Sequence, residues 1–184
     1  MRKIILSVIL IALLLLTLFS SFIFKEAAVS SETLKFDTGD TAWMIVATAL
    51  VLLMTPGLGF FYGGMVDKKN VISTMLQSFM AMVIVSLLWV VIGFGLSFGP
   101  SIGGVIGNPI PYLFFQNVGV NEAWSLAPTI PFLLFALFQA KFAIITPALV
   151  TGAFAERIRF WAYLLFMMLF ILVVYAPLAH CTWH

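Results

Sequence analysis

The chain has 184 residues, of which 63% are hydrophobic and only 9% are charged. Average soluble domains carry about 25% charged residues, so this composition excludes a soluble globular domain and predicts an integral protein of the lipid bilayer. The formal net charge of +2 gives no basis for a nucleic-acid partner, and the single cysteine excludes an intrachain disulfide.

The first 30 residues have the pattern of a secretory signal. Basic residues precede the apolar run 4–24, and Ala28 and Ser30 provide small side chains for a cleavage site. The apolar run is longer than the roughly 7–15 residues usual in a signal core. Residues 1–30 are therefore either a signal peptide or a retained N-terminal helix, and both alternatives place the following residues outside the cytoplasm.

Residues 31–184 form the predicted membrane domain, an all-α polytopic bundle. Its apolar runs are each long enough to cross about 30 Å of hydrocarbon. The predicted spans are residues 41–62, 71–98, 131–151 and 160–181. Basic pairs occur at 68–69 and 157–159, whereas the predicted loop 99–129 has no lysine or arginine. The positive-inside rule then places the mature N-terminus outside.

Local patterns add detail to the first two spans. Asp40 is the predicted N-cap of the first span, because aspartate accepts hydrogen bonds from the free N–H groups of a helix start. Gly59 and Gly63 match the small-residue motif that lets membrane helices approach closely. Gln77 is predicted to form an interhelical hydrogen bond, and Trp89 is predicted to serve packing.

The third span carries an aromatic face. A helix turns 100° per residue, so Phe135, Phe138 and Phe142 fall within about 60° of one another. By spacing alone, this face serves either packing and lipid contact or the lining of a pathway for a small cation. Lys141 flanks the face, and a lysine in mid-span costs roughly 2.5–3.5 kcal/mol on insertion scales. Its role is either ion relay or structural pairing and snorkelling, while Gln139 is predicted to bridge helices by a hydrogen bond.

The end of the fourth span offers no catalytic or metal site. His180 and His184 lie next to Cys181, but no third strong ligand accompanies them, so we predict no metal and no cofactor. Trp183 is either an interfacial anchor or a cation–π platform. No nucleophile elbow, phosphate-binding loop or metalloprotease motif is present, so we predict that the protein is not an enzyme.

Long co-linear stretches after residue 37 resemble the ammonium transporter (Amt/MEP/Rh) family. These stretches are DTAWMIVATALVLLMTPGLGFFYGGMVDKKNVISTM (40–75), FALFQAKFAIITPALVTGAFAERIRF (135–160) and APLAHCTWH (176–184). The resemblance implies an eleven-helix fold of two inverted repeats, assembled as a homotrimer with one pore per subunit. We expect this chain to be an N-terminal part that supplies the first four helices of that fold.

The resemblance also implies the substrate-binding residues. Phe138 and Phe142 match the two pore-mouth phenylalanines of the family, with Phe142 serving both an aromatic ammonium cage and the pore gate. Trp183 matches the cage tryptophan, and Phe135 is left to packing. The paired pore histidines of the family lie beyond residue 184, so His180 is not a member of that pair.

The function implied by the resemblance is transport of ammonium or ammonia across the plasma (inner) membrane. Ammonium would be recruited at the aromatic cage and conducted through a hydrophobic pore. A PII-type regulator would bind through a C-terminal region outside this chain. The alternatives from other classes are an ammonium-sensing, receptor-type relative and a nonconducting membrane remnant.

Overall fold

The computed structural model describes residues 36–183. The predicted signal segment and His184 lie outside the described residues. Within the described part, four helical spans are long and apolar enough to cross a membrane. They are Thr38–Gly63, Lys68–Phe98, Phe132–Phe154 and Phe160–Trp183. This is the all-α bundle of four spans that the composition predicts.

The spans are built from unequal pieces. The first is α2 (Thr38–Gly63). The second consists of a short 3₁₀ turn (Lys68–Asn70), α3 (Val71–Leu88), a π-helical turn (Trp89–Gly93) and α4 (Phe94–Phe98). The third consists of α5 (Phe132–Leu149) and α6 (Thr151–Phe154). The fourth consists of α7 (Phe160–Leu169), a π-helical turn (Phe170–Tyr175) and α8 (Ala176–Trp183).

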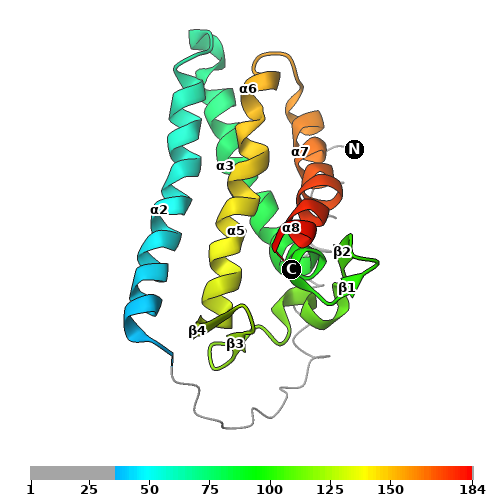
Figure 1. Cartoon of the computed structure of the whole chain (residues 1–184). Coiled ribbons are helices and arrows are strands. Elements are labelled where there is room, and N and C mark those ends of the chain that lie inside the picture. The colour runs from blue at the N-terminus through cyan, green and yellow to red at the C-terminus, as the bar shows by residue number, and fades with distance from the viewer. Residues whose placement is uncertain (1–35, 184) are drawn as a thin grey trace. The chain divides into compact units, whose positions relative to one another are not determined.

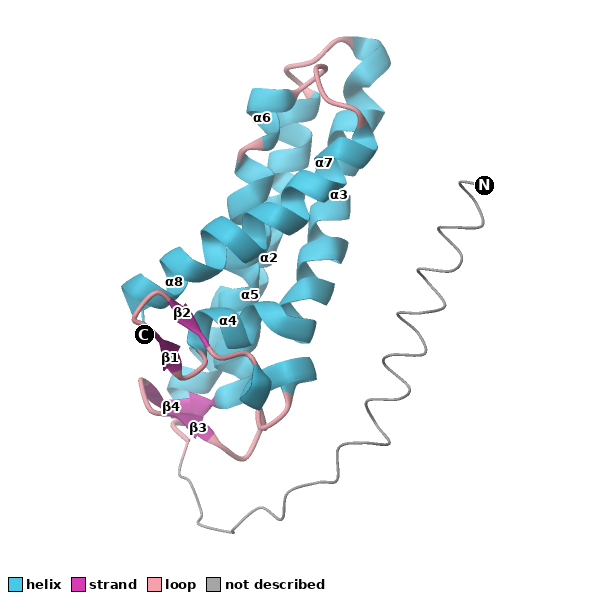
Figure 2. Ribbon diagram, turned by 90° about the vertical axis from the view of Figure 1, so that its right-hand side faces the viewer, coloured by secondary structure: helices cyan, strands magenta, loops and turns pink. Residues whose placement is uncertain are grey.

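The helices pack side by side, with α3 in contact with α2, α5 and α7 (Figure 1). At one end of the bundle lie the loops that carry the basic pairs 68–69 and 157–159, and we call it the basic end. The connection between α4 and α5 lies at the opposite end, which we call the loop end. There α8 packs against α4 and β2 (Figure 2).

The connection at the loop end contains two small antiparallel hairpins. β1 (Ser101–Ile102) pairs with β2 (Ile106–Gly107), and β3 (Ala123–Trp124) pairs with β4 (Ala127–Pro131). A 3₁₀ segment (Ile110–Phe115) lies between the hairpins. The predicted loop 99–129 therefore has the local turn structure expected from its glycine and proline content.

The N-cap of α2 is Asp37, so the prediction of Asp40 is wrong. The Oδ1 atom of Asp37 accepts a hydrogen bond from the backbone N–H of Asp40 at 2.8 Å, and Asp40 itself lies in the first helical turn. The backbone N–H of Asp37 also donates to the carbonyl of Thr129 at 2.9 Å. This tie to β4 fixes where α2 begins, and it joins residues too far apart in sequence for a local pattern to reveal.

The predicted small-residue motif of α2 does mark a helix contact. A Cβ atom added at Gly59 would lie 3.3 Å from the Cβ of Ser78, and one added at Gly63 would lie 2.9 Å from the Cγ of Met75. Both partners belong to α3. The two glycines therefore let the α2 and α3 backbones approach closely, as small residues do in membrane helix pairs.

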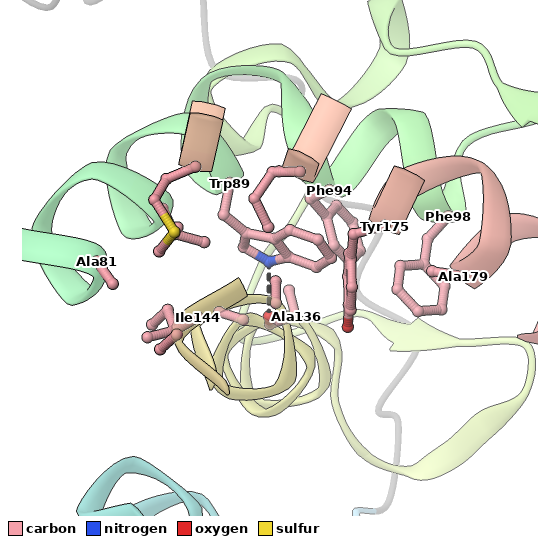
Figure 3. Packing of buried hydrophobic residues seen from close by; sticks show 14 of the residues in the cluster. Ala81, Trp89, Phe94, Phe98, Ala136, Ile144, Tyr175 and Ala179 are labelled. Atoms are coloured by element: carbon pink, nitrogen blue, oxygen red, sulfur yellow. Dashed lines mark hydrogen bonds between the residues drawn. The ribbon is translucent and has the colours of Figure 1, made fainter. Parts of the chain in front are cut away.

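The core is organised around Trp89, which is 0% exposed. Its indole Nε1 donates to the backbone carbonyl of Ala136 on α5 at 3.1 Å (Figure 3). Its ring makes edge contacts with Phe94, Phe98 and Tyr175, at centroid distances of 5.9, 6.3 and 6.1 Å. Edge-to-face geometry suits aromatic quadrupoles. The packing role predicted for Trp89 is confirmed.

The hydrogen bonds predicted to bridge helices through the glutamine side chains are not found among residues 36–183. The Oε1 atoms of Gln77 and Gln139 are buried without a hydrogen-bond partner in the described part of the chain. Instead, the backbone carbonyl of Gln77 accepts from the hydroxyl of Tyr163 at 3.4 Å, and that hydroxyl also pairs with Thr151 Oγ1 at 2.9 Å. The polar link from α3 to α7 therefore depends on tyrosine and threonine.

Two side chains join separate spans and loops at the basic end. The hydroxyl of Tyr62 donates to the carbonyl of Leu149 at 2.7 Å. The carboxylate of Glu156 accepts from the Asn70 amide at 2.9 Å and from the Asp67 backbone N–H at 2.8 Å. These hydrogen bonds, with Asn70 contributing most, lower the pKa of Glu156 from its usual range. They connect the α2–α3 loop to the α6–α7 loop.

Substitution of Gly99 tests the close packing at the loop end. A Cβ at this position would clash with the backbone carbonyl of Asn108, which cannot move aside as a side chain could. We expect Gly99→Ala to destabilise the fold by at least about 1–3 kcal/mol, the usual cost of overpacking, measured by thermal unfolding in detergent. Gly57→Ala is the matched control, because a Cβ at Gly57 has nothing within 4 Å. Equal melting temperatures for the two variants would contradict this account.

The Glu156 contacts predict a pH dependence at the basic end. A carboxyl group with a lowered folded-state pKa stabilises the fold above its unfolded pKa of about 4.3, and this contribution is lost as the pH falls through the folded value. We therefore expect the stability difference between the native chain and Glu156→Gln to shrink as the pH falls below about 4. Thermal unfolding of both proteins across pH measures it. A difference that stays constant with pH would show that the ionised carboxylate contributes nothing.

Candidate functional site

The predicted site residues Phe138 and Phe142 form a ring pair on α5. Their centroids are 5.1 Å apart and their planes meet at 75°, which is an edge contact. Both side chains are half-buried. Phe135 behaves differently, since its ring contacts Phe98 at 5.3 Å and Trp124 at 6.1 Å in the core. All three rings of this face are half-buried, and the structure separates them by their partners: Phe135 contacts rings of other elements, whereas Phe138 and Phe142 contact each other.

Trp183 lies at the end of α8 with 44% of its surface exposed. It lines an open groove of about 220 Å³ that runs along the fourth span, and Thr146 of α5 lines the same groove. Within residues 36–183, no ring contact joins Trp183 to Phe138 or Phe142. The connection is made through Thr146, whose hydroxyl donates to the carbonyl of Phe142 at 2.7 Å.

Other groove residues were not predicted from the sequence. Thr146, Tyr175 and Thr182 are also among the residues that line this largely apolar groove. Two of them had a local signal: Thr146 follows Phe142 by one helical turn, and Thr182 precedes Trp183 directly. Tyr175 had none, because its place in the groove depends on the packing of the fourth span against α5.

The His180 side chain is buried and forms hydrogen bonds between elements of the fold. Its side chain is 3% exposed, with Nδ1 at 3.1 Å from the carbonyl of Ser97 and Nε2 at 2.9 Å from the hydroxyl of Ser101. A carbonyl only accepts hydrogen bonds, so Nδ1 carries a proton in this geometry. The histidine joins α8 to the end of α4. Among the described residues, no group of three or more histidine, cysteine, aspartate or glutamate side chains is placed to hold a metal.

Lys141 is half-buried on α5 and has no ion pair within the described part of the chain. The carboxylates of residues 36–183 lie near the ends of the spans, at Asp37, Asp40, Asp67, Glu122 and Glu156. Within residues 36–183, no carboxylate forms an ion pair with Lys141.

A helical bundle whose spans are long and apolar enough to cross a membrane defines a multi-pass membrane protein. The sequence model of the Ammonium Transporter Family matches residues 42–184. The chain is 42% identical over 172 residues to an ammonium transporter of Aquifex aeolicus, covering 92% of this chain and 38% of that protein. The chain belongs to the ammonium transporter family.

Solved structures agree with this assignment. The crystal structure of Saccharomyces cerevisiae Mep2 matches with a TM-score of 0.73 and 33% identity, covering 85% of this chain and 36% of Mep2. A structure described as a sensor Amt protein matches with a TM-score of 0.68 and 30% identity, covering 77% of this chain and 33% of that one. The chain spans less than two fifths of the length of these relatives.

Substitution of Lys141 tests how its charge is accommodated. Because no carboxylate compensates it among the described residues, we expect Lys141→Met to favour membrane insertion by roughly 2.5–3.5 kcal/mol, the cost of a central lysine on insertion scales. Glycosylation mapping of the third span in microsomes measures this. Gln139→Met is the control, since it changes a neutral neighbour. If the third span inserts equally well in the native chain and in Lys141→Met, the charged Nζ of Lys141 already reaches water.

Proposed function

We propose that the chain supplies an ammonium recruitment site and one wall of the conduit of an ammonium transporter. The observation that carries the proposal is that Trp183 and Thr146 line one groove, with the Phe138–Phe142 pair beginning one turn away on α5. The matching relatives named as ammonium transporters support transport. Sensing, the other candidate, is supported only by the sensor structure of the same fold.

Physical chemistry makes these side chains suitable for recruitment. A cation over an aromatic face gains about 0.5–2 kcal/mol, which is enough to concentrate ammonium but far less than the cost of removing its water. A bare ion therefore cannot pass cheaply between apolar walls. Loss of a proton before the apolar stretch would lower this barrier, so that ammonia crosses and Phe142 acts as the gate.

The proposal includes an orientation and an assembly. The basic end would face the cytoplasm by the positive-inside rule, which places the groove near the outer surface of the plasma membrane. An inverted-repeat transporter has its pathway between repeats, so the opposite wall would come from a second repeat of an eleven-helix fold. The family resemblance also leads us to propose that the full-length protein assembles as a homotrimer. A PII-type regulator would bind it through a C-terminal region outside this chain.

Replacement of Trp183 tests the recruitment site. In the transporter that contains these residues, we expect Trp183→Ala to raise the half-saturating ammonium concentration about 2- to 30-fold, which corresponds to one cation–π contact. Phe142→Ala should mainly change the maximal rate, because it removes the gate. Uptake of labelled methylammonium in cells without their own transporters measures both.

Trp161→Ala is the matched control for this experiment. Trp161 is 49% exposed and lies on the same span, but at the basic end. The Trp161→Ala substitution should leave the half-saturating ammonium concentration unchanged. If Trp183→Ala and Phe142→Ala both retain native uptake over the whole concentration range, these residues do not form the recruitment site.

A further inference from the structure

We propose that the tip of the β1–β2 hairpin, residues 102–105, is a lipid-contact surface that lies in the boundary region of the bilayer at the loop end. The inference goes beyond transport, because it concerns how the connection between α4 and α5 meets the membrane. Its partner is the lipid surface itself, and no substrate takes part in the contact.

The hairpin tip is apolar and uncharged. Ile102 and Val105 flank the turn with 53% and 57% of their surfaces exposed, and residues 99–121 contain no charged side chain. Between them, Gly103 and Gly104 have φ values of +63° and +74°, which glycine adopts without steric cost. Turns that face water are usually built from polar residues as well as glycine. Two exposed branched side chains on one tight turn therefore indicate a partner of low polarity.

The tip is held at the level of the last turn of the fourth span. The thiol of Cys181 donates to the carbonyl of Gly104 at 3.5 Å and to the carbonyl of Val105 at 3.6 Å. Cys181 belongs to the membrane-length span Phe160–Trp183. Figures 1 and 2 show β2 beside α8, and Figure 1 shows the hairpin on the side of the bundle away from α2. The tip therefore lies next to the end of an apolar span and does not project beyond it.

An exposed apolar row on the fourth span leads to this hairpin. Leu165, Leu169 and Val173 are exposed and follow one another at four-residue spacing, which places them along one side of the helix. Two further steps of four residues reach Cys181, beside the tip. Exposed apolar side chains of a membrane span contact lipid tails, which are as apolar as leucine. The hairpin tip thus continues a lipid-facing surface of the span.

The backbone of the tip is suited to a region with little water. β1 pairs with β2, and the N–H of Val105 donates to the carbonyl of Ile102 at 3.4 Å. The Cys181 thiol supplies a donor to two carbonyls of the turn. Backbone polar groups without partners are costly where lipid replaces water, so these internal bonds favour lipid contact. No residue of 101–107 lines the groove beside Trp183, so a partner seated in that groove need not cover the tip.

Fluorescence quenching of the 184-residue chain in lipid nanodiscs tests the inference. In a Cys181→Ser background, which removes the single cysteine but keeps a donor, Ile102→Cys and Val105→Cys are each labelled with bimane. Phosphatidylcholine with a nitroxide near the headgroup end of its acyl chain quenches from the lipid, and iodide quenches from water. We expect both labels to lose fluorescence to the nitroxide lipid and to be protected from iodide.

Two labelled positions serve as matched controls. Asn121 is exposed in the same connection between α4 and α5, so a label on Asn121→Cys should be quenched by iodide and not by the nitroxide lipid. Leu165 lies on the exposed row of the fourth span, so a label on Leu165→Cys should show the opposite pattern. Thermal unfolding equal to that of Cys181→Ser shows that each labelled variant is folded.

The other outcomes overturn the inference. If iodide quenches the labels at Ile102 and Val105 as strongly as the label at Asn121, the tip lies in water. If neither quencher acts, a second copy of the chain covers the tip. The same labels are placed in the transporter that contains these residues, where protection from both quenchers would show that its further helices cover the tip. No readout involves ammonium, so the result is independent of the proposed function.

Discussion

The hydrogen bond from the Trp89 indole to the carbonyl of Ala136 is the contact on which the rest of this bundle depends. It joins the second span to α5 in an interior where an unpaired N–H would be costly. The rings of Phe94, Phe98 and Tyr175 surround the indole, so the same contact also positions the fourth span. Trp89 begins one π-helical turn and Tyr175 ends the other. Both rings are buried in the core, and π-helical turns often occur at functional sites.

This core also contacts the aromatic face of α5. Ala136 is fully buried and the ring of Phe135 contacts Phe98, while the half-buried rings of Phe138 and Phe142 contact each other. The position of the fourth span then places Trp183 over the same helix, and the groove forms between them. At the basic end, Glu156 joins the two loops and Tyr62 joins α2 to the end of α5. The bundle is therefore fixed at both ends, and the groove opens on one side of it.

Much of the architecture could be predicted from local sequence patterns. Apolar runs of membrane-spanning length predict helices because the hydrocarbon core leaves no other partner for the backbone. The Gly59 and Gly63 spacing predicted a close contact, although only the structure shows that α3 provides it. Predictions that concern single polar groups were less successful. Asp37, not Asp40, caps α2, and its backbone is held by distant Thr129, while the side-chain oxygen of Gln77 has no hydrogen-bond partner among residues 36–183.

The sequence by itself determined that this protein is a helical membrane protein, and its long co-linear stretches pointed to the ammonium transporter family. Hydropathy and residue order are properties of the chain, so no folding is needed to read them. Only the tertiary structure decided how the aromatic face of α5 is used, because spacing assigns Phe135, Phe138 and Phe142 equally to one face. It also brought Thr146 and Trp183 into one groove. Side chains from different spans meet only when the helices pack, and packing is set by contacts that no local pattern contains.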